Sequence, residues 1–118
     1  MITQEVIDAV NKKFKTFFET HYFKVRKDYS GMKATNQSTS LTFYITCDCY
    51  ASWYQEENNV DSYLYAKLPY TDCIVLKYEF KADGKNEAQI VATLDKIFTD
   101  PDFLRMLDWT LPNISKKI

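Results

Sequence analysis

The sequence predicts an α+β fold in which an N-terminal helix and two C-terminal helices pack on one face of an antiparallel sheet of three or four strands. Two observations lead to this prediction. Apolar residues recur every three or four positions near both ends of the chain, which is typical of amphipathic helices. Between those ends, apolar and polar residues alternate along runs that short polar stretches connect, which indicates a meander of strands.

The composition predicts one domain over residues 1–118. Nine Tyr and eight Phe stand against only two Gly and three Pro, so we expect a packed core rather than disorder. The formal net charge of −1 gives no general basic field, which argues against nucleic-acid binding. The chain shows no apolar run of membrane-spanning length and no signal-peptide pattern, so we expect a cytoplasmic protein.

Residues 3–19 should form the first helix, with Thr3 as its N-cap. Its apolar stripe consists of Val6, Ile7, Val10, Phe14, Phe17 and Phe18. Residues 21–28 should form a short strand with the basic cluster Lys24, Arg26 and Lys27. Solvated edge charges best explain this cluster, and contact with an acidic partner is the alternative. The polar stretch 30–40 has no periodic pattern and should be an exposed loop.

Residues 41–54 form the strongest strand pattern, with one apolar parity and one parity of hydroxyls and tyrosines. The run is longer than an ordinary strand, so we expect a bend, a bulge or an overhang within it. After a polar connection at 55–61, residues 62–68 and 73–82 alternate again, with a turn at 69–72. One register that keeps the apolar face intact pairs Tyr50 with Tyr65 and Asp48 with Lys67; next along, Tyr65 would pair with Lys77 and Tyr63 with Glu79.

The C-terminal part should form two helices. Asn86 can cap a helix that runs to about Phe98, with Gln89 in the capping-box position. Asp100 and Pro101 suit the N-cap and first position of the next helix. Three further apolar residues should fix the tail against the core: Trp109, Leu111 and Ile114.

No set of residues indicates catalysis, a metal or a cofactor. The cysteines Cys47, Cys49 and Cys73 lack the spacing of common zinc sites, and His21 is the single histidine. Buried thiols behave as small hydrophobes, and a histidine at a helix exit suits the last carbonyls. A small-molecule site or an unrecognised enzyme, placed between sheet and helices near Cys47, Cys49 and His21, is the alternative function.

The hydroxyl-rich strand face is the main candidate site. Its predicted partner-binding residues are Tyr44, Asp48, Tyr50, Tyr54, Tyr63, Tyr65, Lys67 and Lys77. Tyrosine favours strands, so a purely structural face is one explanation. Tyrosine is also enriched in interfaces, which favours a non-catalytic module that binds a protein partner or itself, as a homodimer.

The order helix, meander, helix is similar to that of phage tail-completion proteins, small anti-defence inhibitors and immunity proteins. This resemblance rests on the order of elements alone and transfers no residue. The chain is rich in Lys, Asn, Ile, Tyr and Phe, a bias that suits an AT-rich genome. Together these features suggest an inhibitor or assembly protein of a phage or another mobile element.

Overall fold

The computed structural model describes residues 2–28, 31–47, 62–68, 73–108 and 113–118. Its helices are α1 (Gln4–Thr20), α2 (Glu87–Phe98) and α3 (Pro101–Leu107). Its strands are β1 (Lys24–Asp28), β2 (Gly31–Thr35), β3 (Thr42–Cys47), β4 (Ser62–Lys67), β5 (Ile74–Phe80) and β6 (Ile114–Lys117). The fold is therefore α+β, as the sequence predicted.

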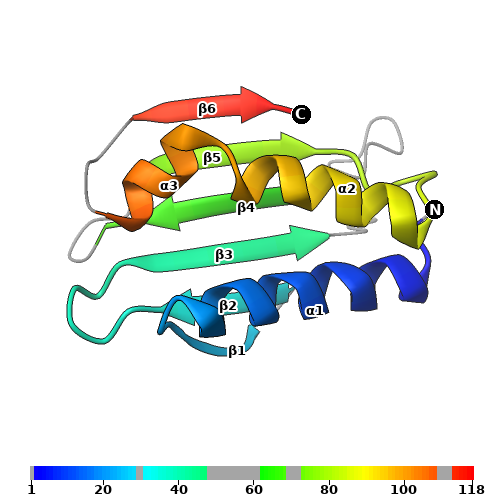
Figure 1. The fold of residues 1–118 in the computed structure, drawn as a ribbon. Helices are drawn as coiled ribbons and strands as arrows, with labels where there is room; N and C mark the ends of the chain where they lie inside the picture. Colours follow the sequence, from blue (N-terminus) through cyan, green and yellow to red (C-terminus); the bar gives the residue numbers. More distant parts are fainter. Residues whose placement is uncertain (1, 29–30, 48–61, 69–72, 109–112) are drawn as a thin grey trace, which may run out of the picture.

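The six strands form one mixed sheet in the order of the sequence, β1 to β6 (Figure 1). The first five strands pair antiparallel, and β6 pairs parallel to β5. The prediction of three or four strands is thus too low. The antiparallel meander is correct from β1 to β5, and the parallel strand at its end was not expected.

All three helices lie on one side of the sheet (Figure 1). Helix α1 packs against β1, β2 and β3, and also against α2. Phe18 of α1 stands at the centre of an aromatic cluster, with ring centroids 4.9 Å from Phe43 of β3 and 6.1 Å from Phe103 of α3. These rings are fully buried or nearly so, and their burial holds the helices against the sheet.

The helix starts agree with the capping residues that the sequence indicated. The Thr3 side chain accepts a hydrogen bond from the backbone N–H of Val6. Asn86 and Gln89 form a complete capping box at the start of α2, with both bonds at 2.9 Å. Asp100 caps α3, whose first residue is Pro101. Each cap satisfies a backbone N–H that lacks a partner within its helix.

Residues 31–35 were expected in a loop, and this prediction is wrong because they form β2. The segment has only two apolar side chains, Met32 and Ala34, and they point to the core between β1 and β3. Gly31 is required there, because a Cβ atom at this position would lie 1.9 Å from the backbone oxygen of Ile45. Two neighbouring strands stabilise a sequence whose own strand pattern is weak.

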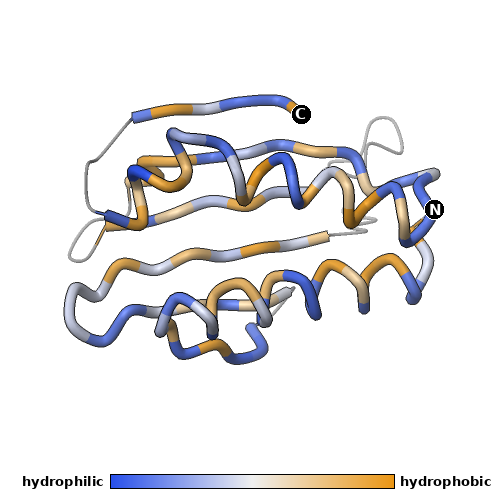
Figure 2. Tube along the Cα trace, viewed as in Figure 1, coloured by the Kyte–Doolittle hydropathy of each residue, from blue (hydrophilic) through white to orange (hydrophobic). Residues whose placement is uncertain are grey.

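The strand β6 was also missed, because Ile114–Lys117 is short and polar. Figure 2 shows that both edge strands, β1 and β6, are mostly hydrophilic. Of the residues expected to fix the tail, Ile114 does pack on the core, while Trp109 and Leu111 lie outside the described residues.

The strand registers agree with the sequence only in part. The pairs Tyr65–Lys77 and Tyr63–Glu79 occur as predicted. The pairing of β3 with β4 is different, because Tyr65 lies opposite Tyr44 rather than Tyr50. The predicted parity is nevertheless correct, and Phe43, Ile45 and Cys47 are buried. The alternation breaks at the start of β5, where Ile74 is 45% exposed next to the register shift after Ala66.

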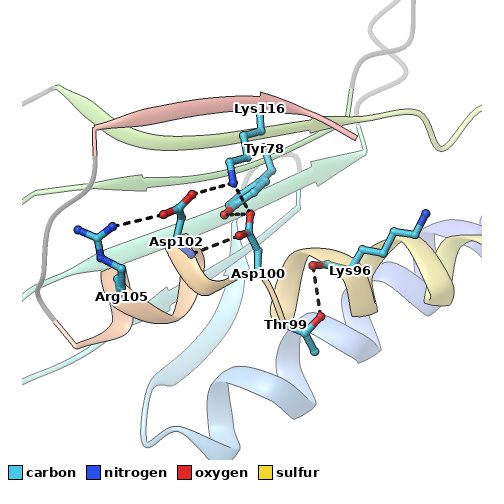
Figure 3. A network of polar contacts seen from close by, with 7 residues as sticks. All are labelled: Tyr78, Lys96, Thr99, Asp100, Asp102, Arg105 and Lys116. Carbon is cyan, nitrogen blue, oxygen red and sulfur yellow. Dashed lines mark hydrogen bonds and ion pairs between the residues drawn. The ribbon is translucent and has the colours of Figure 1, made fainter.

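A polar network joins β5, α3 and β6 (Figure 3). The buried Tyr78 hydroxyl donates a hydrogen bond to Asp100 Oδ2 at 2.7 Å. Lys116 Nζ of β6 lies 2.9 Å from Asp100 Oδ2 and 2.7 Å from Asp102 Oδ2. Burial raises the pKa of Asp100, but the hydrogen bonds from Tyr78 and Lys116 outweigh it, so its pKa is lowered overall. The ionised carboxylate thus stabilises the attachment of the last strand.

Because the pKa of Asp100 is lower in the folded state, its contribution is present above the unfolded pKa of about 4 and is lost as the pH falls. We expect Asp100→Asn to lower the free energy of unfolding by about 1–3 kcal/mol at about pH 7. The deficit should shrink at about pH 3, as measured by urea denaturation. Asp95→Asn is the control, since the Lys13–Asp95 ion pair is exposed and contributes little. An Asp100→Asn deficit that does not change with pH would show that the carboxylate charge is not its source.

Candidate functional site

The candidate site is the sheet face opposite the helices, here called the open face. Five of the predicted binding residues belong to it by strand parity: Tyr44, Tyr63, Tyr65, Lys67 and Lys77. They are half-buried, in contrast to the buried residues that alternate with them. The other three, Asp48, Tyr50 and Tyr54, lie outside the described residues. No described helix or strand covers the open face.

One row of side chains crosses the open face from β1 to β6. In strand order it consists of Arg26, Lys33, Tyr44, Tyr65, Lys77 and Ser115. Neighbouring strands are about 4.8 Å apart, so the part of the row from Arg26 to Lys77 spans roughly 19 Å. The sheet thereby places two tyrosines at the centre of the row, with cations on both sides of them.

The two central tyrosines stack on each other. The ring centroids of Tyr44 and Tyr65 are 5.0 Å apart, and the planes differ by 14°. Lys33 Nζ lies 5.6 Å from the Tyr44 centroid and Lys67 Nζ lies 5.9 Å from it, within cation–π range. Lys77 Nζ lies 4.3 Å from the centroid of Tyr63. These contacts hold the lysines over the rings and order the surface.

Burial raises the pKa of Tyr65, and the neighbouring Tyr44 and Asp28 raise it further. The hydroxyl is therefore protonated at neutral pH and can donate a hydrogen bond to an acceptor. The influence of Asp28 on Tyr65 also agrees with the strand register, which places Asp28 on the same face.

To the predicted Lys67 and Lys77 the structure adds four cations that the sequence analysis did not connect with the tyrosines: Lys24, Arg26, Lys33 and Lys117. Strand parity places on the open face six cations, Lys24, Arg26, Lys33, Lys67, Lys77 and Lys117, and two carboxylates, Asp28 and Glu79. The described face is therefore positively charged although the whole chain has a net charge of −1. The other described residues carry nine cations and nine carboxylates, so the excess of positive charge among the described residues lies on this face.

Tyr22 is a further residue that the sequence analysis did not single out. Its side chain is 93% exposed, and its backbone has a φ of 66°, a conformation that residues other than glycine rarely adopt. It terminates α1, where its N–H donates to the Glu19 oxygen and the N–H of Phe23 donates to the Phe18 oxygen. The positive φ of Tyr22 is thus part of the turn that ends α1. Next to Tyr22 is a hollow of about 420 Å³, lined also by Lys24 and by residues 36–38.

The helix side has a smaller groove of about 270 Å³ between α1 and α2. The stacked rings of Phe17 and Phe98, with centroids 4.3 Å apart, line it together with His21. His21 Nδ1 lies 2.8 Å from the Phe17 oxygen, as expected for a histidine at a helix end. The groove faces outward and does not lie between helices and sheet.

The two described residues of the alternative site, His21 and Cys47, do not come together. The last turn of α1 packs at the beginning of β3, through Phe18 and Phe43, whereas Cys47 ends that strand and is buried. Cys73 is exposed on another strand connection, and Cys49 lies outside the described residues. Within the described ranges, no three His, Cys, Asp or Glu residues are grouped so that they could hold a metal ion. None of the described helices is both long and apolar enough to cross a membrane.

Comparisons with protein-family models, with curated proteins and with solved structures found no match to this chain. The open face and its surroundings are therefore the basis for assigning a function.

Replacement of Tyr22 tests whether its backbone is strained. We expect Tyr22→Gly to raise the free energy of unfolding by about 0.5–1 kcal/mol, since glycine adopts positive φ without a Cβ clash, while its greater freedom when unfolded offsets part of the gain. Tyr22→Ala is the matched control and should give no gain, as measured by urea denaturation. A loss of stability in Tyr22→Gly would mean that contacts of the ring outweigh the strain.

Proposed function

We propose that this chain is a non-catalytic protein-interaction module that binds a protein partner, or a second copy of itself, through the open face. The observation that supports this proposal is the ordered row of stacked tyrosines and flanking cations. Tyrosine offers a rigid ring and a polar tip, which can be desolvated against a partner at little entropic cost.

The contact geometry suggests how such binding would work. Tyr44 and Tyr65 would form the central anchor, because binding energy concentrates in well-packed aromatic residues at the middle of an interface. Lys33 and Lys77, which flank them, would set orientation through charge. The result would be occlusion or assembly of the partner, with no bond made or broken.

The biological setting is part of the same proposal. Element order and composition suggest an inhibitor of the anti-defence or immunity type, or an assembly protein, encoded by a phage or another mobile element. An odd number of cysteines favours a reducing compartment such as the cytoplasm.

A site-specific crosslinking experiment tests the proposal in cells that express the protein. A photoreactive benzoylphenylalanine would replace Thr42, which lies on the open face, and in a control would replace Leu104, which is 40% exposed on α3. We expect a discrete protein adduct from position 42 and none from position 104. An adduct with twice the mass of the chain would identify a second copy, which light scattering on the purified protein would confirm.

In the same experiment, Tyr44→Ser with Tyr65→Ser should abolish the adduct from position 42. The double variant loses one aromatic pair, so its free energy of unfolding should fall by only about 1–2 kcal/mol and it should remain folded. If the serine variant unfolds, Tyr44→Phe with Tyr65→Phe replaces it, because this variant keeps the stacked rings. It lacks both hydroxyls and should therefore give less of the adduct. Adducts that persist in the folded tyrosine variants, or that form equally from position 104, would contradict the proposal.

The groove between α1 and α2 keeps the alternative of a small-molecule-binding protein or an enzyme open to test. Thermal-shift measurements with nucleotides and divalent metal ions would reveal a ligand of this groove. We expect no ligand to raise the thermal midpoint of the wild-type protein and to lose this effect in the His21→Ala variant. Such a rise would move the function to the helix side of the molecule.

A further inference from the structure

We infer that the partner of the open face is a protein with an acidic surface, which the cations around the Tyr44–Tyr65 pair recognise. The inference rests on the proposed function and specifies the chemistry of the partner.

Charge complementarity is the first argument. Six cations and two carboxylates share the described open face, whereas the other described residues carry nine cations and nine carboxylates. Within the described residues, the excess of positive charge therefore lies on this one surface. Such a separation of charge attracts a partner of the opposite sign and speeds its association.

The placement of the donors gives the second argument. Arg26 and Lys33 lie on one side of the tyrosine pair, and Lys77 lies on the other. Carboxylates of a partner could thus be bound on both sides of a central aromatic contact. The protonated Tyr65 hydroxyl adds a neutral donor between them.

A second copy of the chain is a poorer occupant of this face. A symmetric dimer would bring the same patch together twice, so that cations would oppose cations across the interface. Like charges in a desolvated interface cost free energy, and the two carboxylates, Asp28 and Glu79, could compensate only a part.

Single-stranded nucleic acid is also a poorer occupant. Base stacking needs exposed aromatic faces, whereas Tyr44 is flanked by Tyr65 on one neighbouring strand and by Lys33 on the other. The row that contains Tyr63 also includes Asp28 and Glu79, which would repel phosphates. Carboxylates on a protein surface can bind the available ammonium and hydroxyl groups without stacking.

Two labelled probes distinguish these occupants by fluorescence anisotropy. One is a poly-glutamate peptide of about 20 residues, long enough at about 3.3 Å per residue to cross the sheet. The other is an oligothymidylate of equal charge. We expect saturable binding of poly-glutamate that weakens as salt is added, and weaker binding of the oligonucleotide.

The matched variants are Lys33→Glu with Lys77→Glu on the open face and Lys12→Glu with Lys15→Glu on α1, which change the net charge equally. The open-face pair should lower the affinity for poly-glutamate about tenfold or more, while the α1 pair should change it less than about twofold. Lys33→Arg with Lys77→Arg should keep the affinity, and circular dichroism checks that each variant is folded.

Equal losses in the two glutamate pairs, or no saturable binding of poly-glutamate, would overturn the inference. Tighter binding of the oligonucleotide, lost in the open-face pair, would assign the face to nucleic acid instead. A discrete protein adduct from position 42 without poly-glutamate binding would leave the proposed function standing and reject only the acidic partner.

Discussion

The packing of Phe18 against Phe43 and Phe103 is the contact on which the rest of the structure depends. It joins the first helix, a central strand and the last helix in one buried cluster. Since side chains alternate along each strand, burial of one parity under the helices commits the other parity to the opposite face. The row of tyrosines and cations is thus a direct consequence of where the phenylalanines lie.

Most of the fold could be predicted from local signals. The helices have complete apolar stripes and recognisable caps at Thr3, Asn86 and Asp100, so their positions followed from the chain itself. The central strands alternate strongly, which fixed their parity. The pairing of β3 with β4 did not follow, because the alternating pattern extends to Tyr54 and several registers bury the same apolar set. The short polar strands β2 and β6 form because a neighbouring strand supplies their hydrogen bonds.

Only a part of the candidate site could be predicted to share one face from the sequence alone. Parity alone placed Tyr44, Tyr63 and Tyr65 on a common face. Lys77 was also predicted beside Tyr65, but Arg26 and Lys33 could not be connected with the tyrosines, because these two cations belong to strands whose place in the sheet only the tertiary structure gives. The local sequence around a charged residue does not show whether the residue lies on a solvated edge strand or in the row beside the tyrosines. The positive charge of the open face therefore depends on the order of the strands in the sheet, and no single segment of the sequence encodes it.

The two outer strands have a consequence for how recognition can evolve. β1 is rich in lysine and arginine, and β6 ends in two lysines, one of which is held by Asp100 and Asp102. Charged edges discourage the addition of a further strand, so main-chain pairing with a foreign peptide is disfavoured on both sides. Any partner would then be contacted by side chains that project from the sheet. Their identity can change one codon at a time without disturbing the backbone beneath, which permits a shift in specificity while the scaffold stays the same.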